Sequence, residues 1–201
     1  TAGSRLFLHE DIYDEVLDRL VGRLGALTVG DPLDETSDMG AIINGKQHAS
    51  IDDYLAEGRS NTAMTVALGG SAPSEGVLTE GFYHLPTVFA GVRNDFRLAQ
   101  EEIFGPVLVA IPWREVDDVV AMANDSSYGL AAFLWGRNLD AVLNTAHRID
   151  AGWVQVNQGG GQVVGQSYGG YKQSGIGREV SLEGMLAGFT QTKQINVRLR
   201  G

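Results

Sequence analysis

The sequence predicts an α/β fold with a largely parallel, twisted sheet and helices on both of its faces. The second half alternates continuous apolar runs with stretches of helical periodicity: PVLVAIPW, a helical stretch, LAAFLWG, a second helical stretch, and GWVQVN. Continuous apolar runs are typical of strands buried on both faces, and strands that alternate with helices form parallel sheets through right-handed crossovers. The first half also begins with a short apolar run before a helical stripe.

In the first half, RLFLHE predicts a strand and DIYDEVLDRLVGRL a helix. Tyr13, Leu17, Leu20 and Leu24 form one apolar stripe at helical spacing, and Asp11 is the expected N-cap. GKQHASIDDYLAEGRSN then predicts a second helix, and TAMTVALGG a strand. GFYHLPTVFAGV predicts an extended segment whose proline indicates a sheet edge or a bulge.

In the second half, PVLVAIPW, LAAFLWG and GWVQVN predict three strands. Residues 116–123 and 139–146 repeat apolar side chains at helical spacing and predict the intervening helices. A glycine-rich loop, QGGGQVVGQSYGGYKQSGIGRE, precedes a short helical stretch, SLEGMLAGF. The tail TQTKQINVRLR alternates polar and apolar residues, which predicts an exposed strand that needs a partner edge.

Composition limits the class of protein. With 201 residues, of which 43% are apolar, the chain is long enough for one principal domain. A formal net charge of -10, without a cluster of Lys and Arg, argues against nucleic acids and anionic membranes as partners. No apolar stretch approaches the roughly 20 residues of a membrane helix, and no signal-peptide pattern opens the chain, so we expect a soluble, cytoplasmic protein.

The sequence contains no cysteine, which excludes disulfides, thiolate metal sites and a cysteine nucleophile within this chain. The four histidines, His9, His48, His84 and His147, are scattered and show no metal-ligand spacing such as HxxxH. We therefore expect no metal site, and we interpret each histidine as hydrogen-bonded or solvated.

Thr1 is the first candidate for chemistry. In N-terminal nucleophile hydrolases, a threonine hydroxyl is activated by its own free amine. Such hydrolases are sandwiches of two antiparallel sheets and would show short alternating strands early. This chain instead passes quickly to a helix and a parallel-type alternation, so a Thr1 hydrolase is the less favoured interpretation.

The stretch QEEIFGPVLVAI is the second candidate. Two adjacent carboxylates, Glu101 and Glu102, precede a buried strand and are followed by Phe104 and a Gly-Pro turn. In the absence of the aromatic residue and the turn, such a pair is more often a solvated turn. With the aromatic residue and the turn present, one carboxylate could accept two hydrogen bonds from a ribose diol while the aromatic ring packs against a flat heterocycle.

The glycine-rich loop that ends in YGGYKQSGIGRE is the third candidate. It contains neither GxGxxG after a strand nor GxxxxGK[ST], so the pattern does not favour a phosphate-binding loop. Glycines also allow a loop to pass closely over a core or to adopt positive φ. We interpret the loop as the wall of a pocket.

Six stretches in register resemble the C-terminal part of the aldehyde dehydrogenase superfamily. They are TAGSRLFLHEDIYDEVLDRL, EGFYHLPTVFAGV, AQEEIFGPVLVAIPW, SSYGLAAFLWGRNLD, AGWVQVN and YGGYKQSGIGREVSLEGM. The resemblance implies the oxidation of an aldehyde to a carboxylic acid with NAD or NADP. In that reaction a cysteine thiolate attacks the aldehyde, the thiohemiacetal gives its hydride to the nicotinamide, and a glutamate-activated water releases the acid.

The resemblance also assigns roles to residues of this chain. The nucleophile is expected immediately before Thr1, so no catalytic residue is expected within the chain, which alone should be inactive and bind no cofactor. Glu102 matches the residue that holds the nicotinamide ribose hydroxyls, and Phe104 the aromatic that contacts the nicotinamide end. The loop from Gln158 to Tyr168 matches the segment that lines the substrate tunnel.

Two departures within that loop bear on the substrate. Tyr168 replaces the usual phenylalanine of FGGxK, and Gln162 stands at a position that is often aromatic. Both departures argue against an aromatic, purely apolar substrate pocket and make a more polar aldehyde admissible. Asn157, at the end of GWVQVN, matches a residue that we expect to fix the loop.

The resemblance gives residues 1–188 as the catalytic domain and residues 189–201 as a strand of an oligomerisation arm. We expect a homo-oligomer that forms through Thr190, Ile195, Val197 and Leu199, a small aldehyde as substrate, and no nucleic-acid or membrane partner. The main prediction is therefore part of a dehydrogenase. A Thr1 hydrolase and a non-catalytic interaction module on the same fold are the alternatives.

Overall fold

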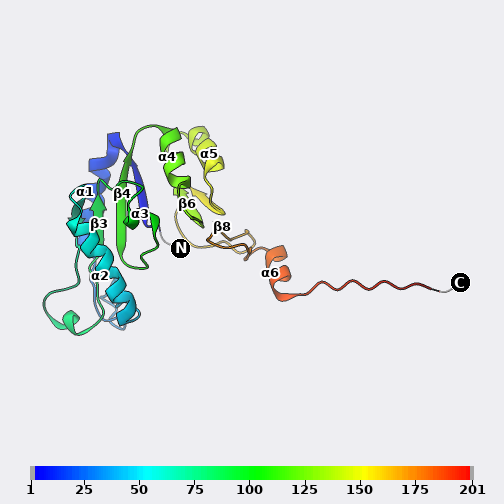
Figure 1. Cartoon of the computed structure of the whole chain (residues 1–201), viewed down its shortest axis with the longest axis horizontal. Coiled ribbons are helices and arrows are strands. Elements are labelled where there is room, and N and C mark those ends of the chain that lie inside the picture. Colours follow the sequence, from blue (N-terminus) through cyan, green and yellow to red (C-terminus); the bar gives the residue numbers. More distant parts are fainter. Residues whose placement is uncertain (1–2, 200–201) are drawn as a thin grey trace. The chain divides into compact units, whose positions relative to one another are not determined.

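The structure is a computed structural model that describes residues 3–199. The chain divides into two compact units between Asp125 and Ser126 (Figure 1). Within the described residues, no helix combines the length and the apolar character that crossing a membrane requires.

A four-stranded sheet with the order β1-β4-β3-β2 is the centre of the first unit. Strands β1, β4 and β3 run parallel, whereas β2 pairs antiparallel with β3 and carries a register shift between Val66 and Leu68. The strands are β1 Arg5–His9, β2 Thr65–Leu68, β3 Thr87–Ala90 and β4 Val107–Trp113. The helices are α1 Tyr13–Gly25, α2 Gly45–Ser60, α3 Arg97–Gln100 and α4 Val116–Asn124, with short 3-10 turns at Glu10–Ile12 and Val77–Glu80.

The main core lies on one face of this sheet. Phe89 of β3 and Val109 of β4 are register partners and are both buried with Ile51 and Leu55 of α2. Met122 of α4 packs against the same cluster. Because side chains alternate between faces along a strand, α2 and α4 therefore cover the face that carries Phe89 and Val109.

Helix α1 covers the opposite face. It contacts β1 and β2, which are the two edge strands, and must therefore run across the sheet. Buried Leu8, Val88 and Ala110 alternate with the residues of the main core and point to this side. The expected α/β arrangement, a largely parallel sheet with helices on both faces, is confirmed for this unit.

The second unit contains two small sheets. Strands β6 and β7 pair in parallel, as the alternation predicts, and the short strands β5 and β8 pair antiparallel. The elements are β5 Tyr128–Gly129, β6 Ala131–Leu134, α5 Leu139–Arg148, β7 Trp153–Val156, β8 Tyr171–Lys172 and α6 Leu182–Phe189. Asn138 caps α5 and Ser181 caps α6, each side chain accepting a hydrogen bond from a backbone N–H in the first turn.

Several local expectations were wrong. LAAFLWG is not buried on both faces, because β6 is half-buried and Trp135 is 67% exposed. Asp11 does not cap α1: it lies in a 3-10 turn whose cap is His9, and α1 follows from Tyr13. Thr87–Ala90 lies inside the sheet, with the proline immediately before the strand, so the proline marks no sheet edge; the register shift beside this strand lies in β2.

The tail after α6 takes an extended course (Figure 1). Residues 190–199 form no strand within the described part of the chain, and their apolar side chains are exposed. The pairing of this tail with a partner edge stays a prediction.

Candidate functional site

Glu102 and Phe104 lie in the segment between α3 and β4, and both side chains are exposed. Ile103 between them is buried in the main core and anchors the segment. The backbone of Phe104 has φ +52°, and its ring is 68% exposed. A left-handed conformation is uncommon for a bulky residue and is typically held in place by the surroundings. The segment thus presents a carboxylate and an aromatic ring to solvent from a fixed base.

Helix α2 holds this segment through three residues that share one helical face, Gln47, Ile51 and Tyr54. The Gln47 amide donates to the carbonyl oxygens of Ile103, at 2.8 Å, and Phe104, at 3.4 Å. Ile51 is fully buried, and a Cβ built on Gly105 would lie 2.7 Å from its Cδ1 atom, so the backbone of Gly105 packs directly against this side chain. The spacing of four and three residues places all three on one side of the helix.

Tyr54 completes the attachment by donating from its hydroxyl to Glu101 Oε2 at 2.7 Å. Arg97 donates to the same oxygen at 2.9 Å and also pairs with Glu57 at 3.0 Å, while its guanidinium lies over the Tyr54 ring. The Tyr54 hydroxyl, and then Arg97, lower the pKa of Glu101. Glu101 is therefore an ionised structural partner.

The adjacent carboxylate differs. Among the residues that the structure describes, no hydrogen bond or ion pair joins the Glu102 carboxylate to another residue. Of the two adjacent carboxylates, one is used to fix the backbone and the other is available to a ligand. The role of Glu102 in holding the nicotinamide ribose stays a prediction.

The second unit contains the other predicted site residues. Gln158 and Gln162 are exposed in the loop after β7. Tyr168 is half-buried, with its ring edge-on to Trp153 at 5.3 Å between centroids, and its backbone exchanges hydrogen bonds with Glu179. Asn157 fixes the start of the loop as expected, since its side chain bonds both the N–H and the carbonyl of Gly136.

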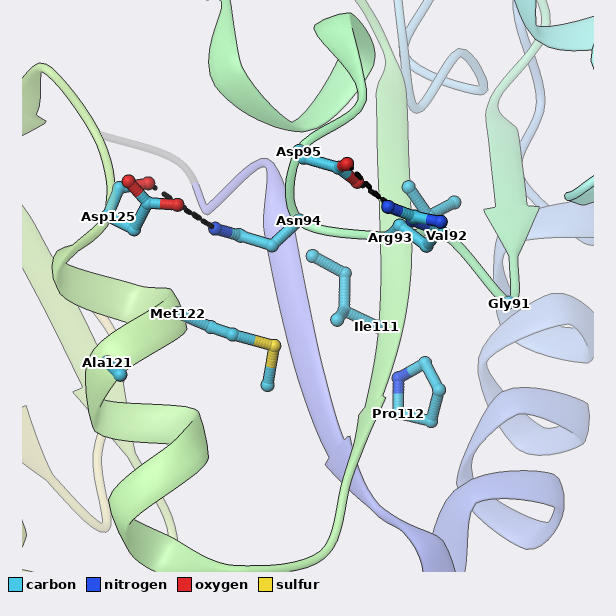
Figure 2. Close-up of a pocket in the computed structure, with 10 residues that line it drawn as sticks. All are labelled: Gly91, Val92, Arg93, Asn94, Asp95, Ile111, Pro112, Ala121, Met122 and Asp125. Atoms are coloured by element: carbon cyan, nitrogen blue, oxygen red, sulfur yellow. Dashed lines mark hydrogen bonds and ion pairs between the residues drawn. The ribbon is translucent and has the colours of Figure 1, made fainter.

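An open depression of about 620 Å³ also lies in the first unit (Figure 2). Figure 2 shows Met122 of α4 and Ile111 of β4 facing each other across it. Its polar residues already have partners: Arg93 pairs with Asp95, and Asn94 bonds Asp125. No residue that the sequence singles out lines this depression, so it does not compete with the segment around Glu102 as the candidate site.

Comparison with known proteins decides the family. The family model described as the aldehyde dehydrogenase family matches residues 1–195. The chain belongs to the aldehyde dehydrogenase family. Hydroxyisobutyraldehyde dehydrogenase of Mycolicibacterium austroafricanum is 44% identical over 198 residues, which cover 98% of this chain and 38% of that protein. Putative aldehyde dehydrogenase DhaS of Bacillus subtilis is 41% identical, over 98% of this chain and 39% of that protein.

Solved aldehyde dehydrogenase structures agree with the fold. The NAD+ complex of the Bacillus cereus enzyme superposes with a TM-score of 0.90 at 36% identity, over 99% of this chain and 39% of that one. Betaine aldehyde dehydrogenase of Staphylococcus aureus in complex with NAD+ gives 0.88 at 31% identity, over 93% of this chain and 37% of that one. The chain thus spans somewhat more than a third of the length of these relatives.

These relatives do not support the alternatives. They are aldehyde dehydrogenases, not N-terminal-threonine hydrolases or interaction modules, and Thr1 itself lies outside the described residues.

Sequence reasoning missed two features of this aldehyde dehydrogenase chain. The role of Gln47 and Tyr54 could have been suspected from their shared helical face with Ile51, but their target lies about fifty residues away. The second feature is a contact between histidines: the rings of His48 and His84 stack at 4.2 Å between centroids. Their separation in the sequence conceals this contact.

Proposed function

We propose that this chain forms part of an enzyme that oxidises an aldehyde to a carboxylic acid with a nicotinamide cofactor. Its contribution is the contact with the nicotinamide end of the cofactor. The observation that carries the proposal is the segment around Phe104, in which an exposed ring and a carboxylate without a partner project from a backbone held by α2. A ribose diol and a flat heterocycle fit these two groups.

The residues present fit the cofactor on chemical grounds. NAD, when bound, accepts the hydride that the aldehyde carbon loses. Glu102 is proposed to accept two hydrogen bonds from the ribose hydroxyls, and Phe104 to limit how far the nicotinamide ring can rotate. The chain contains no cysteine, so the thiolate that the family mechanism uses is not supplied by these 201 residues. We expect the chain alone to form no NADH from aldehyde and NAD.

A chimera tests the proposal directly. The matching 198 residues of the M. austroafricanum relative are replaced by this chain, and aldehyde-dependent NADH formation is measured. The chimera should be active, and Glu102→Gln should lower kcat/KM for NAD roughly 10- to 100-fold, because a hydrogen bond to a charged group contributes about 1.5–3 kcal/mol.

The matched control is Glu115→Gln, which removes an exposed carboxylate just after β4 and should leave kcat/KM unchanged. An active chimera in which both variants behave alike would refute the assignment of Glu102. A folded but inactive chimera would refute the proposed function.

A polar, hydroxylated aldehyde is the proposed substrate class, and NAD is proposed over NADP. Gln158 and Gln162 support the first, since their exposed amides can bond a substrate hydroxyl. A relative named hydroxyisobutyraldehyde dehydrogenase also supports the substrate class, and NAD+ complexes of similar enzymes support NAD as the cofactor. In the chimera, Gln162→Leu should raise KM for a hydroxyaldehyde but not for the aldehyde of the same length without the hydroxyl. Equal changes would contradict the substrate class.

Self-association through the tail and a cytoplasmic location are further proposals. Ile195, Val197 and Leu199 are 72%, 75% and 86% exposed, and alternating exposed apolar residues favour pairing with another strand. Analytical ultracentrifugation of the chain should show an oligomer. The double variant with Ile195→Asp and Val197→Asp should dissociate it. The control, Gln194→Asp with Asn196→Asp, adds the same charge on the polar side and should leave the oligomer intact. Fractionation of the source cells should place the protein in the cytosol.

A further inference from the structure

A compact group of His48, Asp52 and His84 lies away from the proposed cofactor site. His48 and Asp52 are one turn apart in α2, and His84 lies in the segment that precedes β3. The three side chains offer ligand atoms that all lie within 4.8 Å of one another. The His84 side chain is fully buried, whereas Asp52 is about half exposed, so the group opens to solvent on one side.

The hydrogen bonding of a neutral His48 determines which of its ring nitrogens carries the proton, and the nitrogen that faces Asp52 is the one without it. His48 Nε2 lies 3.2 Å from the carbonyl oxygen of Tyr83, to which it must donate. A neutral imidazole has one N–H, so Nδ1 then turns a lone pair toward the Asp52 carboxylate. A lone pair and a carboxylate repel each other unless a proton, a water molecule or a metal ion lies between the two. A backbone carbonyl that binds the far N–H of a histidine is also the usual support of a metal ligand.

Distances within the group favour a metal ion over a hydrogen-bonded ion pair. His48 Nδ1 lies 3.4 Å from Asp52 Oδ2, and His84 Nε2 lies 3.8 Å from Asp52 Oδ1. Charge-assisted N–H···O bonds are shorter, about 2.7–2.9 Å. With zinc–ligand bonds of roughly 2.0–2.2 Å, two ligand atoms of a tetrahedral site lie roughly 3.3–3.6 Å apart. The first distance already matches. The second requires Asp52 to rotate and the His84 ring, which stacks on His48, to turn so that its Nε2 leaves the His48 carbonyl.

His84 is suited to ligation as a neutral ring. The side chain lies fully inside the protein, where a neutral imidazole is favoured over a charged one, and a neutral imidazole keeps one lone pair. Its Nε2 lies 3.2 Å from the carbonyl oxygen of His48, and its Nδ1 is buried without a hydrogen-bond partner. Ligation through Nε2 would replace the bond to that carbonyl by a bond to the metal and move the ring proton to Nδ1. Because this bond is lost, we expect moderate rather than very tight affinity.

We propose that His48, Asp52 and His84 bind a divalent transition-metal ion, with Zn²⁺ as the preferred ion and water at the open fourth position. Two imidazoles and a carboxylate form a ligand set that Zn²⁺ accepts. Among the described residues, no Lys or Arg pairs with Asp52, so the metal also supplies the positive charge that this carboxylate lacks. The bound ion would tie α2 to the segment before β3.

The test uses the 201-residue chain without a histidine tag, freed of metal with a chelator that is then removed. Titration with Co²⁺ should give the visible bands of a four- or five-coordinate ion at one equivalent, and Zn²⁺ should displace it. Zn²⁺ should also raise the melting temperature. Asp52→Asn should weaken Zn²⁺ binding about 100-fold or more, since loss of even an outer partner of a ligand typically costs 10- to 100-fold.

Asp53→Asn is the matched control, because Asp53 is the adjacent, exposed carboxylate on the same helix. It should bind both ions as the unchanged chain does. Asp52 is half exposed and its replacement is isosteric, so circular dichroism should show an intact fold. A second variant, His48→Gln, should lose the cobalt spectrum as well.

Three results would overturn the proposal. The first is an absence of cobalt bands at one equivalent. The second is binding that Asp52→Asn leaves unchanged, which would identify adventitious surface binding. The third is a melting temperature that Zn²⁺ does not raise in the unchanged chain, because an ion that ties α2 to the segment before β3 should stabilise the fold.

Discussion

Gly105→Ala tests whether α2 determines the position of the segment that carries Glu102 and Phe104. A Cβ at this position would lie 2.7 Å from Cδ1 and 2.8 Å from Cγ1 of Ile51, a residue with no exposed surface. Both atoms belong to a packed core, so neither can move into solvent. Overpacking of this kind typically costs about 1–3 kcal/mol. Gly105 has no left-handed φ, so the added methyl group, rather than backbone strain, would cause the loss.

The size of the effect is separable from general damage by a double-mutant cycle with Ile51→Ala. Ile51→Ala alone should cost about 2–5 kcal/mol, since it removes a fully buried side chain and leaves a cavity. In the double variant, the methyl group added by Gly105→Ala occupies part of that cavity. The cost of the double variant should then be smaller than the sum of the two single costs, by about 0.5–3 kcal/mol, as is typical of residues in contact.

Urea unfolding at neutral pH, followed by far-ultraviolet circular dichroism, measures all four free energies of unfolding. Ile51→Val is the milder substitute if Ile51→Ala leaves too little folded protein, with an expected cost of about 0.5–1.5 kcal/mol. If Gly105→Ala is neutral, or if its cost adds fully to that of Ile51→Ala, the close contact between α2 and this segment does not exist in solution. The proposed fixation of Phe104 would then be wrong.

Two further predictions concern helix packing and charge. Gly22→Ala should stabilise the chain by about 0.8–1 kcal/mol, because Gly22 lies within α1 and nothing lies within 4 Å of an added Cβ. Gly58→Ala in α2 should destabilise the chain, because its Cβ would clash with the buried ring of Phe89. Thermal unfolding of both variants checks these two expectations. Tyr54→Phe should raise the lowered pKa of Glu101 toward its ordinary value, as measured by carboxyl NMR titration, and an unchanged pKa would contradict the hydrogen bond. Because the pKa of Glu101 is lowered in the folded state, the hydrogen bond stabilises the protein at pH values above the ordinary pKa of about 4.5, and this stabilisation is lost as the pH falls through the lowered pKa. The unchanged chain and Tyr54→Phe should therefore converge in stability in acid.

Much of the first unit could be predicted from local sequence. PVLVAIPW became β4, because a strand paired on both sides and covered on both faces selects apolar residues at every position. LAAFLWG is a similarly apolar run, yet β6 is only half-buried and Trp135 is largely exposed. An apolar run thus predicts a strand, but the number of neighbouring elements sets its burial, and that number is a tertiary property.

The start of α1 and the support of the Glu102 segment could not be predicted from local sequence, because both depend on hydrogen bonds that a local pattern does not encode. His9 accepts a hydrogen bond from the Asp11 backbone and shifts the start of α1 to Tyr13, an arrangement that the acidic N-cap pattern does not encode. Glu102 and Phe104 could be predicted because they belong to a contiguous motif. Gln47, which holds that motif, could not, since its hydrogen bond to Ile103 spans 56 residues.

The energies of these contacts explain why Phe104 can hold its ring in solvent before any ligand binds. A left-handed backbone at a bulky residue costs about 1–3 kcal/mol. Against this, the hydrogen bond of Gln47 to Ile103 contributes about 0.5–1.5 kcal/mol. Ile51, whose complete burial contributes about 1.5–3 kcal/mol, packs against Gly105 as well as against the rest of the main core. Both contacts from α2 therefore act against the strain. A cofactor that binds as proposed would meet a backbone that α2 already holds, so little binding energy would be spent on ordering that backbone.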